Sequence, residues 1–218
     1  QDVVPIRLAE LGLKYTASRA SINATGFYTR FDRLAFTDYR FDPVANGYLE
    51  RTAIAGSKTL GFELEARLRP VAGFDLAAQL TWQRARYRDF RFTQLVDGQA
   101  VQTDYTGRQL VRVPALALRV TPAIELLNGK LRTEISVTSF SGRFADIANT
   151  QRLPGYTLVE ASARVQLTER FKLSFQATNL FNAIGLTEGN PRSGSFESGA
   201  VGQKYFLARP EFARSFRM

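Results

Sequence analysis

Apolar and polar residues alternate along residues 58–69, which read KTLGFELEARLR, with almost no interruption. Consecutive side chains of a β-strand point to opposite faces, so residues of one parity share a face. One parity holds Leu60, Phe62, Leu64, Ala66 and Leu68, and the other holds Glu63, Glu65, Arg67 and Arg69. The segment therefore predicts a strand with one apolar face and one charged face.

The same alternation recurs over the whole chain and predicts further strands of similar length. In residues 74–86, for example, Leu76, Leu80 and Trp82 share one parity, whereas Gln79 has the other. The predicted strands lie near 7–15, 20–32, 58–70, 74–86, 111–122, 131–140, 155–167, 171–181 and 206–218. Segments of this length can cross a bilayer when tilted, since a transmembrane strand needs about 9–11 residues.

The connections between these strands alternate between short and long. The short ones are at 17–19, 71–73, 127–129 and 168–170, and the long ones are near 33–57, 87–110, 141–154 and 182–205. Bacterial outer-membrane barrels have short periplasmic turns and longer extracellular loops, whereas a soluble β-sandwich has no reason to sort its loops. The sequence therefore predicts an all-β fold, an antiparallel transmembrane β-barrel with lipid outside and a wet lumen inside.

Composition narrows the possible functions. The chain has 218 residues with no Cys and no His, which removes thiol nucleophiles, zinc fingers and Ser-His-Asp triads. No Ser lies in a nucleophile motif, so we do not expect an enzyme. No apolar run reaches the roughly 18 residues of a membrane helix. The net charge of +9 permits a nucleic-acid partner, but successive strands carry apolar outward faces, and we expect no nucleic acid.

Six segments, in the same order along the chain, carry a family resemblance. They are ELGLKY (10–15), NATGFYTRFDRL (23–34), KTLGFELEARLRP (58–70), LPGYTLVEASARVQL (153–167), QATNLFNAIG (176–185) and LARPEFARSFRM (207–218). Together they make the chain resemble the C-terminal part of a TonB-dependent outer-membrane receptor. The family's last strand is matched by Ala208-Arg209-Pro210 and Arg214-Ser215, with Ala213 in place of the usual Gly.

The resemblance implies a larger protein than this chain. The family has an N-terminal plug domain and a 22-stranded barrel, whereas only about nine or ten strands are predicted here and nothing resembles a plug or a TonB box. We therefore expect residues 1–218 to be a single piece of the C-terminal barrel, truncated at both ends. The alternative is a complete small barrel of eight or ten strands that acts as a passive pore or an enzyme.

The resemblance also implies the function. Receptors of this family sit in the outer membrane of Gram-negative bacteria and import a scarce ligand, commonly a ferric siderophore or another metal chelate. TonB would act through the missing plug, and the barrel would contact outer-membrane lipid and lipopolysaccharide as a monomer. We expect no cofactor other than iron carried in the transported chelate, and no metal site, because Asp89, Asp97 and Asp104 are dispersed.

Candidate ligand contacts lie in the predicted long loops. Arg guanidinium groups bind carboxylates bidentately and stack on aromatic faces, which suits an anionic chelate. The candidates are Arg40 in the first long loop and Arg86, Tyr87, Arg88, Phe90 and Arg91 in the run RARYRDFR. If the strand continues through this run, Arg86, Arg88 and Phe90 share one side. The alternative is that these arginines bind lipopolysaccharide phosphates or are simply solvated.

Two further assignments follow from the strand pattern. Glu63, Glu65, Arg67 and Arg69 are expected to form ladders of ion pairs with neighbouring strands on the lumen face. Asn179 and Asn182, near the end of predicted strand 171–181, are expected to cap the change from strand to loop.

Overall fold

The computed structural model describes residues 4–42, 47–96, 99–189 and 208–218. Within these ranges the side chains of residues 36–42, 47–52, 94–96 and 100 are not described. No helix in this part of the chain has the length and apolar character needed to cross a membrane.

A nine-stranded antiparallel sheet forms the body of the described structure, with neighbouring strands joined in chain order. Its strands are β1 (Ile6–Ala17), β2 (Ala20–Asp42), β3 (Gly47–Val71), β4 (Phe74–Arg88), β7 (Leu116–Leu126), β8 (Leu131–Phe140), β11 (Tyr156–Gln166), β12 (Lys172–Thr178) and β15 (Ser215–Arg217). This confirms the predicted fold class and strand number. β1 and β15 lie at the two edges, so the sheet is an open part of a barrel.

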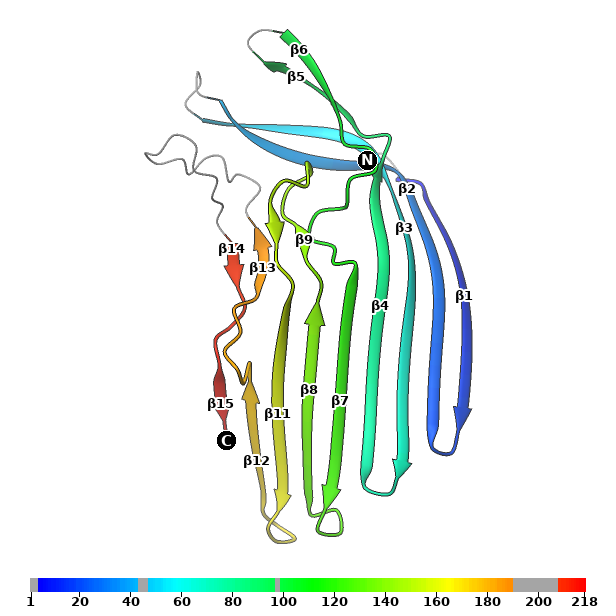
Figure 1. The fold of residues 1–218 in the computed structure, drawn as a ribbon, viewed down its shortest axis with the longest axis vertical. Helices are drawn as coiled ribbons and strands as arrows, with labels where there is room; N and C mark the ends of the chain where they lie inside the picture. Colours follow the sequence, from blue (N-terminus) through cyan, green and yellow to red (C-terminus); the bar gives the residue numbers. More distant parts are fainter. Residues whose placement is uncertain (1–3, 43–46, 97–98, 190–207) are drawn as a thin grey trace.

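All the short turns lie at one end of the sheet, and the long connections gather at the other (Figure 1). The predicted sorting of the connections is therefore confirmed. At the long-connection end, three small two-stranded ribbons stand apart from the main sheet. They pair β5 (Arg91–Val96) with β6 (Gln99–Asp104), β9 (Arg143–Phe144) with β10 (Arg152–Leu153), and β13 (Leu186–Gly189) with β14 (Ala208–Pro210).

The prediction that residues 33–57 form a loop was wrong. Beyond an irregularity between Phe31 and Leu34, β2 and β3 continue to pair from Leu34↔Ala55 out to Asp42↔Gly47. A bulge of this kind increases the local twist, and the paired ribbon bends away beyond the other strands (Figure 1). Alternation does not reveal the extension, because polar residues occur at both parities in this part of the sequence.

Two predicted strands have different bounds in the structure, because the backbone turns or lacks an N–H donor within them. The strand predicted at 111–122 begins only at Leu116, since Arg112 has a left-handed φ of 64° and Pro114 offers no N–H. The last predicted strand, 206–218, begins outside the described residues and is divided. Its described part consists of β14, which pairs with β13, and β15, which pairs with β12.

The strand register lines up the apolar residues on one face of the whole sheet. Ala24 lies opposite Leu64, Leu64 lies opposite Leu80, and Leu80 lies opposite Leu118. The same face carries Leu11 and other large apolar side chains that are mostly exposed; Leu11 itself is 82% exposed. Because monomeric soluble proteins rarely expose so large an apolar surface, this face requires an apolar environment outside the chain.

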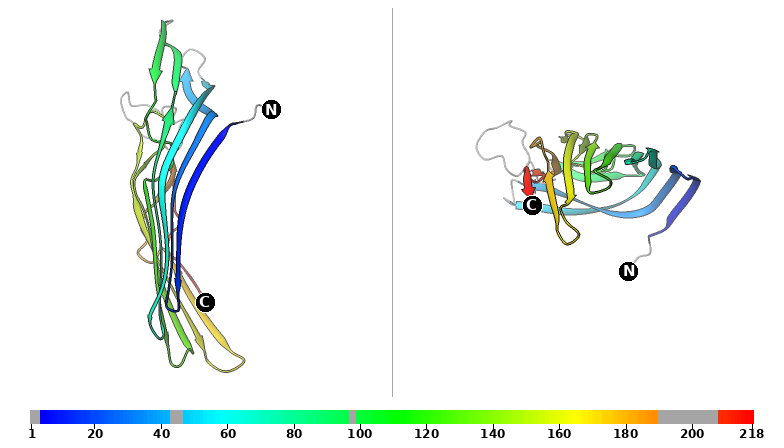
Figure 2. Two further views of the ribbon diagram at one scale, coloured as in Figure 1. Left: turned by 90° about the vertical axis from the view of Figure 1, so that its right-hand side faces the viewer. Right: turned by 90° about the horizontal axis from the view of Figure 1, so that it is seen from below.

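The opposite face is polar across the same strands. Glu63 lies opposite Thr81, Gln79 opposite Arg119, and Ser136 opposite Glu160. A slip of one residue in any pair would mix the two faces, so the alternation of each strand and the register of the sheet are consistent with each other. The sheet is strongly curved and forms an arc when viewed along the strands (Figure 2).

Gly155, immediately before β11, provides a test of the packing between strands. A Cβ placed there would lie 2.6 Å from the Phe140 carbonyl oxygen and 3.1 Å from the Gly142 nitrogen, and neither backbone atom can easily move. We expect Gly155→Ala to lower the free energy of unfolding by about 1–3 kcal/mol, measured by urea unfolding in detergent. Gly26→Ala is the control, because no atom lies within 4 Å of its Cβ position; equal effects of the two changes would contradict the packing argument.

Candidate functional site

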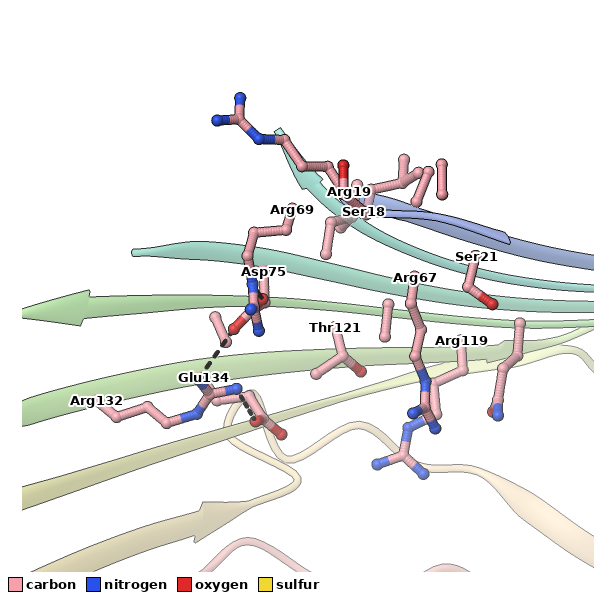
Figure 3. Close-up of a pocket in the computed structure, with 17 residues that line it drawn as sticks. Ser18, Arg19, Ser21, Arg67, Arg69, Asp75, Arg119, Thr121, Arg132 and Glu134 are labelled. Carbon is pink, nitrogen blue, oxygen red and sulfur yellow. Dashed lines mark hydrogen bonds and ion pairs between the residues drawn. The ribbon is translucent and has the colours of Figure 1, made fainter. Parts of the chain in front are cut away.

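The polar face is hollowed near the short-turn end of the sheet (Figure 3). The hollow has a volume of about 640 Å³, and side chains from β1–β2 through β8 line it. Its charged residues are Arg19, Arg67, Arg69, Arg119, Arg132, Asp75 and Glu134. The position of this hollow indicates that the polar face is the concave, inward face of the curved sheet.

A network of ion pairs crosses four adjacent strands in this hollow (Figure 3). Arg69 on β3 contacts Asp75 on β4, with 2.7 Å between Nε and Oδ1. Arg132 on β8 reaches the other oxygen of Asp75 at 3.1 Å and Glu125 on β7 at 2.7 Å. Arg132 also lies 3.9 Å from Glu134 on its own strand. The predicted cross-strand ladder is confirmed for Arg69, but within the described residues no ion pair joins Arg69 to Glu63 or Glu65.

The hollow is basic overall, since five arginines stand beside two carboxylates in its lining. Arg119 is held by the Ser136 hydroxyl at 2.9 Å and by Glu160 at 3.8 Å. Fixed cations in a low-dielectric wall attract anions, so this surface favours a negatively charged ligand over a positive one. Within the described ranges, no group of three or more potential metal ligands is present.

Arg119 and Arg132 lie on the polar face of the sheet, but alternation within one strand gives no sign that they take part in a network. Their partners lie on other strands, so the network depends on register. The sequence of one strand does not say which residue of the next strand lies opposite, so the network could not be predicted from it.

At the opposite end, aromatic side chains build a small packed core beneath the long connections. Tyr87 at the end of β4 is fully buried, and Phe90 is 2% exposed. The Phe90 ring lies between Tyr87 and Tyr105, with ring centroids 5.1 and 5.4 Å apart in edge-on geometry. The backbone supports the same packing, because the Tyr105 amide donates to the Phe90 carbonyl at 2.8 Å.

This core changes the interpretation of two candidate ligand residues. The rings of Tyr87 and Phe90 pack against the chain itself, so their faces are not open to a ligand. The premise that one extended segment continues through the run was wrong. Asp89 has a left-handed φ of 49°, and the turn that it makes separates β4 from β5. Whether any of these residues binds ligand stays a prediction.

The candidate arginines are spread over different surfaces. Arg86 and Arg88 lie on β4 with the parity of Leu80 and Trp82, so they belong to the apolar, convex face and not to the polar one. Arg91 lies on β5 and pairs across the hairpin with Asp104 at 3.4 Å. Arg40 belongs to the outer part of β2, and its side chain lies outside the described residues.

Asp104 stays ionised in the β5–β6 hairpin. Hydrogen bonds from the Thr106 hydroxyl and then the Thr106 amide hold the pKa of Asp104 below its ordinary value of 3.8. The carboxylate is therefore available to Arg91 at neutral pH. Both side chains are at least half exposed, so solvent screens the pair and it adds little to stability.

The long connections are tied together by buried polar side chains. Arg143 is only 5% exposed and donates to the carbonyls of Leu186 and Thr187 at 2.8 and 2.9 Å. Asn179 accepts from the Ala183 amide at 2.8 Å and donates to the Phe212 carbonyl at 2.9 Å. The predicted capping role of Asn179 is thus confirmed. Asn182 accepts from the Arg214 amide in the same region at 3.1 Å.

Comparison with known proteins identifies the class that this geometry defines. The chain matches the family described as "TonB dependent receptor-like, beta-barrel" over residues 7–180. No curated protein matches the chain in sequence. Because the family match covers most of its length, the chain belongs to the TonB-dependent receptor β-barrel family, whose members are outer-membrane β-barrel proteins of Gram-negative bacteria.

Solved structures support the fold over nearly the whole chain. The siderophore receptor PiuA from Acinetobacter baumannii superposes with a TM-score of 0.71 at 20% identity, covering 97% of this chain and 27% of its own. The ferric yersiniabactin uptake receptor FyuA from Yersinia pestis has a TM-score of 0.71 at 19% identity, with coverage of 97% and 28%. The copper transporter OprC has a TM-score of 0.69 at 16% identity, and the match covers 97% of this chain and 30% of OprC. This chain therefore spans under a third of each of these proteins.

The aromatic core predicts that Phe90 acts by packing. We expect Phe90→Ala to lower the free energy of opening of the loop core by about 3–5 kcal/mol, because it removes the ring that joins Tyr87 to Tyr105. Hydrogen exchange of the Tyr105 amide measures this change. Phe181→Ala is the control, since that ring is 74% exposed; unchanged exchange in Phe90→Ala would show that the core does not depend on this ring.

Proposed function

We propose that residues 1–218 form the C-terminal part of the wall of an outer-membrane receptor that imports a ferric siderophore or a similar metal chelate. In this proposal the chain is a single barrel piece, a plug lies elsewhere in the protein, and TonB supplies energy through that plug. The intact receptor acts as a monomer.

The observation that carries this proposal is the two-faced sheet. Apolar rows that continue across neighbouring strands favour lipid on one face, and fixed charge on the concave polar face favours water on the other. The short turns lie at one end and the long, packed connections at the other, which is the arrangement of a barrel with its turns in the periplasm. Within the described residues β1 and β15 do not pair, which argues against a complete small barrel.

Two observations favour an anionic chelate as the ligand. The hollow on the inward face has an excess of arginine, so the wall attracts negative charge along the route through the lumen. Two of the proteins with similar structures are, by name, a siderophore receptor and a receptor for ferric yersiniabactin, and a third is a copper transporter. We keep Arg91 and Arg40 as candidate contacts at the mouth of the barrel.

Uptake in cells tests the proposal directly. Cells that express the intact receptor should accumulate a ⁵⁵Fe-labelled siderophore, and deletion of the receptor should abolish this uptake. Deletion of TonB in the same cells should abolish it as well, because energy coupling is part of the proposal. Uptake that persists without TonB would instead support the alternative of a passive pore.

The orientation of the sheet can be measured by electron paramagnetic resonance of the receptor in bilayers. Spin labels go to Leu64, Leu80 and Val165 on the apolar face and to Glu63, Gln79 and Arg164 on the polar face. The first three labels should respond to oxygen, and the last three to a water-soluble relaxation agent. Leu80→Arg should cost about 2–4 kcal/mol of stability if the residue lies near the bilayer midplane. Reversed relaxation responses would contradict the barrel orientation.

A further inference from the structure

Four basic side chains stand directly opposite one another on four adjacent strands. Arg7 on β1 faces Arg30 on β2, Arg30 faces Lys58 on β3, and Lys58 faces Arg86 on β4. We call these four residues the basic row. Directly opposite residues have Cβ atoms about 4.5–5.5 Å apart, and like charges in such positions repel and destabilise the sheet. A row of four cations therefore requires a neutralising anion, either from the chain or from its surroundings.

The basic row lies on the convex face, at the end of the sheet with the long connections. The two preceding rows of the same parity are Leu11–Gly26–Phe62–Trp82 and Ala9–Tyr28–Leu60–Arg84. Going along the strands, the apolar face thus changes to a girdle with Tyr28 and Trp82 and then to cations. Aromatic girdles mark the membrane–water interface in outer-membrane barrels, so the row lies at headgroup depth.

The side chains that the structure describes neutralise only part of this charge. One carboxylate, Asp32, serves three guanidinium groups, at 2.5 Å from Arg30, 3.2 Å from Arg88 and 3.8 Å from Arg7. In the part of the chain that the structure describes, neither Lys58 nor Arg84 forms an ion pair.

Arg86 gives independent evidence for an absent partner. One of its terminal nitrogens donates to the Gly107 carbonyl. Its Nε is buried and has no hydrogen-bond partner among the described residues. A buried donor without an acceptor costs free energy, so an added acceptor at this position would stabilise the site.

We propose that the basic row binds the phosphate groups of a phosphorylated glycolipid in the outer leaflet. This inference rests on the membrane placement in the proposed function. Guanidinium groups bind phosphate oxygens bidentately, and Lys58 supplies a point charge between two arginines. The acyl chains of the same lipid would lie along the apolar rows beneath, starting at Leu60 and Tyr28. A chelate that passes through the lumen does not reach this face, so in this proposal Arg86 contacts lipid and not ligand, whereas Arg88 pairs with Asp32 and Asp89.

The test uses the intact receptor, purified in dodecyl maltoside and titrated with diphosphoryl lipid A or with its dephosphorylated form. Wild type should bind the phosphorylated lipid more tightly than the dephosphorylated one. The variant Arg30→Gln/Lys58→Gln/Arg86→Gln should lose affinity for the phosphorylated form by about tenfold or more. The variant Arg30→Lys/Arg86→Lys, which retains charge, should keep most of the affinity.

A matched control removes three basic side chains from the polar face of the same sheet. Lys14→Gln/Arg164→Gln/Lys172→Gln changes the net charge equally, and its lipid affinity should match wild type. Equal loss in the control and in the basic-row variant would overturn the site in favour of a general charge effect. Inorganic phosphate that competes as strongly as the glycolipid would overturn the lipid as the source of the anion.

Failure of this inference can be distinguished from failure of the proposed function. Membrane insertion is measured separately, by the oxygen response of a spin label at Leu80. A wild-type receptor that inserts, imports its chelate and yet binds both lipid forms equally would overturn the basic row as a lipid site and leave the transport proposal standing. A receptor that does not insert would overturn both.

Discussion

Strand register is the constraint on which the rest of this structure depends. Each strand has two faces because its side chains alternate, but a barrel wall exists only if neighbouring strands pair without a slip of one residue. The alignment of Ala24, Leu64, Leu80 and Leu118 across four strands satisfies this condition. Backbone hydrogen bonds hold the alignment, and in lipid they cannot be exchanged for bonds to water, so the penalty for a slip is large.

The same register distributes the charges between two surfaces with different roles. On the inward face, opposite charges meet across strands, and Arg132 joins Asp75 and Glu125 into one network. On the outward face, like charges meet in the basic row, where Arg30 and Lys58 lie opposite each other and, among the described side chains, Asp32 is the carboxylate that pairs with the row. In the first arrangement Arg132 meets carboxylates of the chain itself, whereas the second requires an anion from the surroundings.

The long connections add a second level of organisation, which rests on burial. Phe90 and Tyr87 pack with Tyr105, and the buried Arg143 satisfies carbonyl groups of a distant segment. These contacts give the end of the barrel a packed base that can hold an exposed hairpin such as β5–β6. Burial also explains why aromatic residues in a run with arginine need not contact a ligand, since the same residues can serve as a small hydrophobic core.

The sequence alone determined the all-β fold, the nine main strands, the short turns and the two faces, because a period of two residues is a local property that every strand displays. It also identified Asn179 as a cap, since turn chemistry is local. Only the tertiary structure set Arg86 opposite Lys58, buried Phe90 and joined Arg132 to its partners. Each of these depends on where a strand ends or which residue lies opposite, and neither is encoded in alternation within one segment.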